Sequence, residues 1–191
     1  MISDAPARKN APGAWLLRLA VVWAALGTGG CASAPPAEPR EYLDESTAAT
    51  VTVAGRSIVF ALERPDLGVN ARDYVTLTGV DVNTSGRHVS HVVGYAWSTL
   101  DKRSADGDAQ ATYELVVEDR VLPLTVMTAG FRSLGLATPP LQSPSRSAVP
   151  LAAKVSRETL ALYVDSPTAR VVRQRAGVTE RFQPWSVTAT R

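Results

Sequence analysis

Apolar and β-branched residues recur in short runs from about residue 47 onward, and turn residues separate the runs. Runs of this length that are rich in Val, Ile, Thr and aromatic residues favour β-strands. They predict strands at 49–54, 56–62, 72–82, 87–99, 111–118, 120–127, 150–155, 168–175 and 178–182. Many short strands with little helix predict a mainly β protein, folded as an antiparallel β-sandwich.

One segment breaks this pattern with helical spacing. Ser156 has the kind of side chain that caps a helix N-terminus. Leu160, Tyr163 and Val164 then share one helical face. We therefore expect one short helix near 157–164.

The most informative pattern is a predicted hairpin between residues 72 and 99. If residues 83–86 form its turn, Tyr74 lies opposite Tyr95 and Arg72 lies opposite Trp97. These side chains then share one face, which leaves two interpretations open. The face is either buried, with the polar tips of Tyr and Trp paired in the core, or an exposed platform that stacks on sugars or on a partner's side chains.

Residues 1–30 differ in composition from the rest of the chain. The basic residues Arg8 and Lys9 precede an apolar run that ends at Leu26, and small residues follow. This order is typical of a cleaved signal peptide. The alternative is a transmembrane helix, which needs about 20 apolar residues, but Arg18 interrupts the run here.

Cys31, the only cysteine, directly follows these small residues. Together with Gly30 it resembles the lipobox of bacterial lipoproteins, although Thr28 stands where that family usually has Leu, Val or Ile. The resemblance implies removal of the signal before Cys31 and acylation of this cysteine, for example with palmitate. In that family, a residue other than Asp after the cysteine directs the protein to the outer membrane, and Ala32 follows here. We expect a lipid-anchored protein at the periplasmic face of the outer membrane.

These features divide the chain into four parts. We expect a signal peptide over 1–30, a lipidated cysteine and a tether rich in Pro and Ala over 31–46, a β-sandwich domain over 47–186, and a frayed C-terminus over 187–191. The layout of the domain resembles immunoglobulin-like and transthyretin-like sandwiches, and the small β-sandwich lipoproteins of bacterial envelopes.

The net charge and the number of cysteines exclude several classes of function and of structural site. Residues 1–30 hold 3 of the 20 basic and 1 of the 18 acidic residues, so residues 31–191 carry 17 of each. A body without net charge has no general attraction to nucleic acid. A single cysteine excludes an internal disulfide framework and a zinc site built from several cysteines.

The sequence singles out no catalytic, metal or cofactor site. His88 and His91 are the only histidines, and their spacing on a strand points them to opposite faces. Ser90 lies between them, but no G-x-S-x-G nucleophile motif is present. Residues 106–108, Asp-Gly-Asp, lack the further acids of a calcium loop and indicate a solvated turn.

We therefore expect a non-enzymatic envelope lipoprotein that uses no cofactor and contacts another envelope protein. A proline-rich stretch at 137–150 predicts a long surface loop that takes part in this contact. The candidate contact residues are Arg72, Tyr74, Tyr95 and Trp97 on the hairpin and Leu141 on the loop. One alternative is a module that binds a glycan or another small ligand on the Tyr74, Tyr95 and Trp97 face, and another is a hydrolase of unfamiliar type that uses a histidine.

Overall fold

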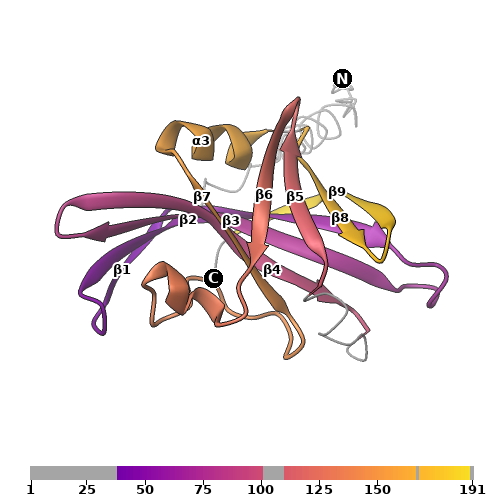
Figure 1. Ribbon diagram of the computed structural model, residues 1–191, viewed down its shortest axis with the longest axis horizontal. Helices are drawn as coiled ribbons and strands as arrows, with labels where there is room; N and C mark the ends of the chain where they lie inside the picture. The colour runs from indigo at the N-terminus through magenta and orange to yellow at the C-terminus, as the bar shows by residue number, and fades with distance from the viewer. Residues whose placement is uncertain (1–37, 101–109, 167, 190–191) are drawn as a thin grey trace, which may run out of the picture. The chain divides into compact units, whose positions relative to one another are not determined.

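A computed structural model describes residues 38–100, 110–166 and 168–189 of the protein (Figure 1). Within these residues the chain forms nine β-strands, one 3-10 helix (η1) and one α-helix (α3). Their bounds are β1 (Arg40–Asp44), β2 (Ala49–Glu63), β3 (Arg72–Thr84), β4 (Arg87–Ser98), β5 (Thr112–Val117), β6 (Arg120–Val126), η1 (Gly130–Leu134), β7 (Val149–Val155), α3 (Arg157–Asp165), β8 (Arg170–Arg175) and β9 (Val178–Ala189). The predicted signal peptide, Cys31 and the turn at 106–108 lie outside the described residues.

Eight strands close into an antiparallel barrel in the order β2-β3-β4-β7-β6-β5-β8-β9, and β9 pairs again with β2. The protein is mainly β, as expected, but the predicted open sandwich is wrong. Closure depends on the pairing of residues 56–61 of β2 with residues 183–189 of β9. These two segments lie far apart in the sequence, so no local pattern of residues reveals their pairing.

β2 makes this closure possible because it has two neighbours along the same edge. The hydrophobic pattern predicts two strands, at 49–54 and 56–62, whereas β2 is one strand of 15 residues. Its first part pairs with β1 and its second part with β9, and the register shifts between Val53 and Ser57. A bulge bends a strand and increases its twist, so this irregularity directs β2 from one neighbour to the other.

The interior of the barrel is filled with side chains. Phe60, Leu151 and Phe182 are fully buried in one core cluster, and α3 contributes Tyr163 and packs Leu160 against it. The hollow that remains beside Tyr163 measures about 10 Å³. Ligand pockets usually measure about 300–1,000 Å³, so this hollow is far too small for a ligand.

A second core lies on the outer face of the barrel. Valines of β2, β3 and β4 contact Phe131, Leu136 and Leu141 there. These three residues belong to the segment 127–148, which includes η1 and is drawn in orange in Figure 1. The stretch predicted as a surface loop thus packs Leu141 against the barrel, while most of its other residues are exposed.

The β3–β4 hairpin differs from the predicted register by two residues. Its turn consists of Ser85 and Gly86 alone, which have φ angles of 53° and 84°. Tyr74 therefore lies opposite Trp97, and Tyr95 lies opposite Thr76, two pairs closer to the turn. A shift of two residues leaves every side chain on its predicted face, so the predicted grouping of residues by face holds.

α3 begins where the sequence indicates. The Ser156 side chain accepts a hydrogen bond from the backbone N–H of Thr159 at 3.1 Å, which is an N-cap contact. β1 lies within the segment predicted as a tether, and β9 runs to Ala189, past the predicted end of the domain at residue 186. In the part of the chain that the structure describes, no helix is long and apolar enough to cross a membrane.

Candidate functional site

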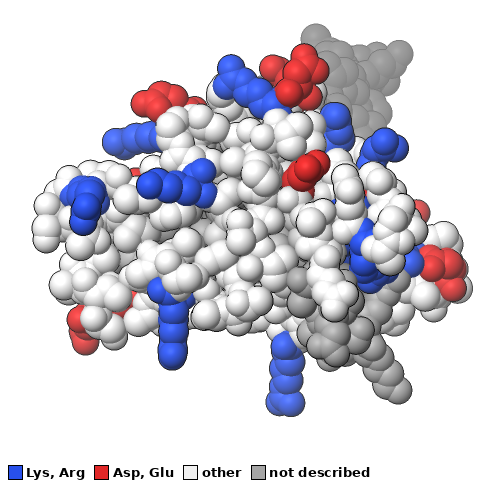
Figure 2. Space-filling model, in the orientation of Figure 1, with Lys and Arg blue, Asp and Glu red and all other residues white. Residues whose placement is uncertain are grey.

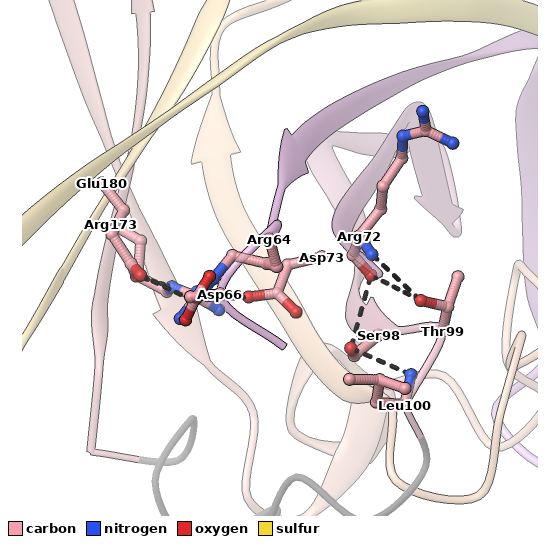
Figure 3. A network of polar contacts seen from close by, with 9 residues as sticks. All are labelled: Arg64, Asp66, Arg72, Asp73, Ser98, Thr99, Leu100, Arg173 and Glu180. Carbon is pink, nitrogen blue, oxygen red and sulfur yellow. Dashed lines mark hydrogen bonds and ion pairs between the residues drawn. The ribbon is translucent and has the colours of Figure 1, made fainter. Parts of the chain in front are cut away.

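A network of ion pairs links β3, β8 and β9 (Figure 3). Arg173 of β8 and Asp73 of β3 are each 2% exposed, and Arg173 Nη2 donates to Asp73 Oδ2 at 2.7 Å. Arg173 Nε donates to Glu180 Oε2 of β9, also at 2.7 Å. Arg64, which follows β2, donates to Glu180 at 2.8 Å and to Asp73 at 3.3 Å.

This network explains how charged residues persist beside an apolar core. Each guanidinium lies at hydrogen-bond distance from carboxylates, which offsets the loss of hydration on burial. The guanidinium carbon of Arg173 also lies 5.1 Å from the centroid of the Phe182 ring. Since both arginines are engaged by two or more carboxylates of the chain itself, we assign this network to stability rather than to binding.

A larger hollow lies outside the barrel, between β1, β4 and the proline-rich segment. We name it the outer groove, and it measures about 510 Å³. Its lining residues are Arg40, Tyr42, Tyr95, Thr138, Pro139, Leu141, Gln142 and Ser143. The volume falls within the range that small-molecule sites occupy, about 300–1,000 Å³.

Three side chains of β1 and one of β4 hold the proline-rich wall of the outer groove in place. Arg40 Nη2, Tyr42 Oη and Tyr95 Oη donate to the backbone carbonyls of residues 140, 138 and 141, at 2.9, 3.2 and 3.3 Å respectively. Asp44 Oδ2 accepts from the backbone N–H groups of residues 137 and 138, at 2.6 and 3.0 Å. The wall is therefore fixed to β1 and β4 by its backbone, although it contains no strand of its own.

The ionisation states of these groups suit their roles. The hydrogen bond from the Thr138 N–H, together with those from Ala137, Ser46 and Thr47, lowers the pKa of Asp44, against the opposite effect of burial. Burial raises the pKa of Tyr95. Burial and the charge of Asp44 raise the pKa of Tyr42, against the effect of Arg40. Asp44 is thus an ionised acceptor at neutral pH, and both phenols are protonated donors.

A second feature lies on the outer face of β3, β4 and β9, where Arg72, Tyr74, Trp97 and Trp185 form what we name the aromatic row. The rings of Tyr74 and Trp97 stack, with centroids 4.4 Å apart and an interplanar angle of 19°. The guanidinium carbon of Arg72 lies 4.6 Å from the centroid of the Trp185 ring. Trp185 is 54% exposed, which is unusual for so large a ring on a strand.

The five contact residues chosen from the sequence divide between these two features. Tyr95 and Leu141 meet in the outer groove, where both are buried. Arg72, Tyr74 and Trp97 lie in the aromatic row, where Tyr74 and Trp97 are half-buried. Trp97 and Tyr95 are two residues apart on the same face of β4, so the two features share one side of the barrel.

Sequence reasoning missed three important residues. Trp185 follows the last predicted strand, so it was not assigned to the face that carries Arg72. Arg40 and Tyr42 lie in the segment predicted as a tether, yet they form β1 and line the outer groove. β1 carries no alternating signal, because its two apolar residues, Tyr42 and Leu43, are adjacent and charged residues flank them on both sides.

The two histidines do not form a catalytic arrangement. His88 Nδ1 lies 2.6 Å from Asp81 Oδ2, and Ser90 Oγ donates to Asp81 Oδ1 at 2.9 Å. Asp81 therefore stands between the serine and the histidine, whereas an activated serine needs the histidine in that place. Burial raises the pKa of Asp81, but the hydrogen bonds from His88 and Ser90 lower it by more, so this carboxylate is a weak base.

His91 lies apart from this cluster and is buried. Burial and the nearby charge of Lys154 lower its pKa, so the imidazole is neutral at neutral pH. Within the residues that the structure describes, no three His, Cys, Asp or Glu side chains lie close enough to hold a metal ion.

Comparisons with protein-family models, curated proteins and solved structures found no match to this chain. The functional argument therefore depends on the geometry of the aromatic row and the outer groove, and on the sequence features that precede residue 38.

Proposed function

We propose that this chain is a lipid-anchored, non-enzymatic module of the bacterial envelope that binds another envelope protein through its aromatic row. In this proposal Cys31 carries the lipid and holds the barrel at the periplasmic face of the outer membrane. The observation that supports the binding role best is the pairing of an exposed Trp185 with Arg72, beside the Tyr74–Trp97 stack.

The proposal places the binding surface on the outside of the barrel, because core side chains fill the inside. Because the hollow beside Tyr163 measures only about 10 Å³, the proposal places the contact with a partner on the outside of the barrel. On the face drawn in Figure 2, basic and acidic side chains are scattered among large uncharged areas. Contact with such a surface depends on particular side chains rather than on general charge attraction.

The residue types of the aromatic row fit a protein contact. Trp, Tyr and Arg are the residues that most often dominate the energy of protein interfaces. Arg72 is also held by Glu63, whose Oε1 lies 3.2 Å from Arg72 Nη2. The stacked rings and the paired arginine are ordered before a partner arrives, which reduces the entropy lost on binding.

The anchor adds to this binding without any new contact. Each methylene of an acyl chain that is buried in the membrane contributes about 0.8 kcal/mol, so two or more chains attach the protein stably. A partner in the same envelope then meets the barrel at a raised effective concentration. A weak contact at the aromatic row is sufficient under these conditions.

Photo-cross-linking in intact cells tests this proposal. A photoreactive amino acid replaces Gln183, which is exposed in the middle of β9, two residues before Trp185. In a control it replaces Thr179, which is exposed near the start of β9. We expect a discrete protein adduct from position 183 and none from position 179. The adduct should weaken in the Cys31→Ser variant, because the anchor is lost. Equal labelling from both positions, or no discrete adduct from position 183, would contradict the proposal.

Two alternatives have less support from the geometry. A ligand that stacks on all three of Tyr74, Tyr95 and Trp97 would need three free rings, but Tyr95 is buried and the other two cover each other. A hydrolase would need polar groups converging in a pocket, and neither His88 nor His91 lines the outer groove.

A further inference from the structure

The outer groove is separate from the aromatic row, and its chemistry differs. Of its eight lining residues, four are apolar or aromatic (Tyr42, Tyr95, Pro139, Leu141), and three carry hydroxyl or amide groups (Thr138, Gln142, Ser143). Arg40 is the one charged residue of the lining. We propose that the outer groove binds a small saccharide that carries a carboxylate.

The positive charge of Arg40 favours a ligand that carries a negative charge over a neutral one. Arg40 Nη2 donates to the Pro140 carbonyl, and the planar guanidinium has further N–H groups with which to meet a carboxylate. Asp44, on the same face of β1 as Arg40, does not compete, because backbone N–H groups of residues 46, 137 and 138 occupy its oxygens. Glu41 points to the other face of β1, where it accepts from Thr52.

The remaining lining residues suit a sugar ring better than an alkyl chain. A pyranose has an apolar C–H face and a rim of hydroxyl groups, so it needs a wall of both kinds. Pro139 offers apolar surface, and the side chains of Thr138 and Gln142 are exposed and polar beside it. The guanidinium carbon of Arg40 lies over the Tyr42 ring, 5.7 Å from its centroid, so a carboxylate held by Arg40 would lie beside this ring. A fatty acid would leave these polar groups without partners when it excludes water from them.

The site is also formed in advance. Tyr95, which is 7% exposed, and Asp44, which is 1% exposed, hold the proline-rich wall from behind. Proline has a fixed φ angle, so the wall loses little conformational entropy when a ligand binds. This rigidity compensates for the small number of direct contacts that a monosaccharide makes.

Calorimetric titration of the full chain, purified in detergent, tests the inference. The probes are N-acetylmuramic acid and N-acetylglucosamine, two sugars that differ by one lactyl ether with its carboxylate. We expect the acidic sugar to bind at least about tenfold more tightly than the neutral one. Arg40→Gln should abolish this preference, and Gln142→Trp, which fills the rim without a change of charge, should abolish binding of both sugars.

Arg132→Gln is the matched control, because Arg132 is exposed on η1 and does not line the groove. It removes the same charge and should leave the preference unchanged. Equal affinity for the two sugars, no measurable binding of either, tighter binding of laurate than of the acidic sugar, or an equal loss in the Arg132 and Arg40 variants would overturn the inference. The cross-linking test at residue 183 concerns a different surface, so either proposal can fail alone.

Discussion

Asp44 shows how one residue shapes a site that it does not line. It sits at the end of β1 and is 1% exposed, and its carboxylate accepts hydrogen bonds from the backbone at residues 46, 137 and 138. Three backbone donors on one carboxylate strongly favour the ionised form. The position of the proline-rich wall therefore depends on the charge of a side chain behind it.

This dependence predicts a pH effect on stability. The pKa of Asp44 is lower in the folded protein than its ordinary value of 3.8, so its contribution is complete above pH 3.8 and is lost as the pH falls toward the folded value. We expect Asp44→Asn to have a lower free energy of unfolding than the wild type at neutral pH, and this difference should shrink in acid. Urea denaturation across the pH range measures it.

Glu45→Gln provides the control for Asp44, because Glu45 is the next residue and is exposed. It should match the wild type at every pH. If the Asp44→Asn difference stayed constant down to strongly acidic pH, the charge of Asp44 would not be what holds the wall.

Asp73 gives a second prediction at the residue scale. Asp73→Asn leaves the buried Arg173 without a full countercharge, and breaking a buried pair from one side costs about 3–5 kcal/mol. Glu63→Gln breaks the pair with Arg72, but Glu63 is 72% exposed, and exposed pairs contribute about 0–1 kcal/mol. Chemical denaturation of both variants should separate these two classes. Similar losses in the two variants would show that the Asp73 network is not effectively buried.

At the scale of elements, the close approach of β3 and β4 depends on Gly94. A Cβ atom at this position would lie 1.8 Å from the backbone oxygen of Thr76, so the strands would have to separate. Gly94→Ala should destabilise the protein by about 1–3 kcal/mol or more. Gly68→Ala, where a Cβ atom would meet nothing closer than 3.9 Å, should change the stability by less than about 1 kcal/mol. Thermal unfolding of the two variants checks the contrast.

Elements with local signals could be predicted from the sequence, and elements without them could not. Ser156 and the spacing of Leu160 and Tyr163 identified the helix, and alternating residues located β3 and β4. The register of their hairpin was predicted wrongly because the turn has only two residues, and Ser85 takes a positive φ angle that Asn or Gly usually adopts. The sequence does not predict that Arg173 is buried, because its partner Asp73 lies on a strand that is distant in the sequence.

At the scale of the whole molecule, barrel closure decides where function is possible. The pairing of β2 with β9 turns a sheet with two free edges into a barrel with a filled interior. Within the residues that the structure describes, both candidate sites, the aromatic row and the outer groove, lie on the outside of the barrel. Two of the residues chosen from the sequence, Tyr95 and Leu141, do meet in that groove, but only the fold places Arg40 and Tyr42 beside them.

Intact-mass spectrometry of the native protein from its envelope tests most directly whether this barrel is a membrane-anchored module. The account predicts a mature chain that begins at Cys31 and carries the added mass of acyl chains, and it predicts that the Cys31→Ser variant lacks this mass. A native chain that keeps Met1 and an unmodified Cys31 thiol would contradict the account.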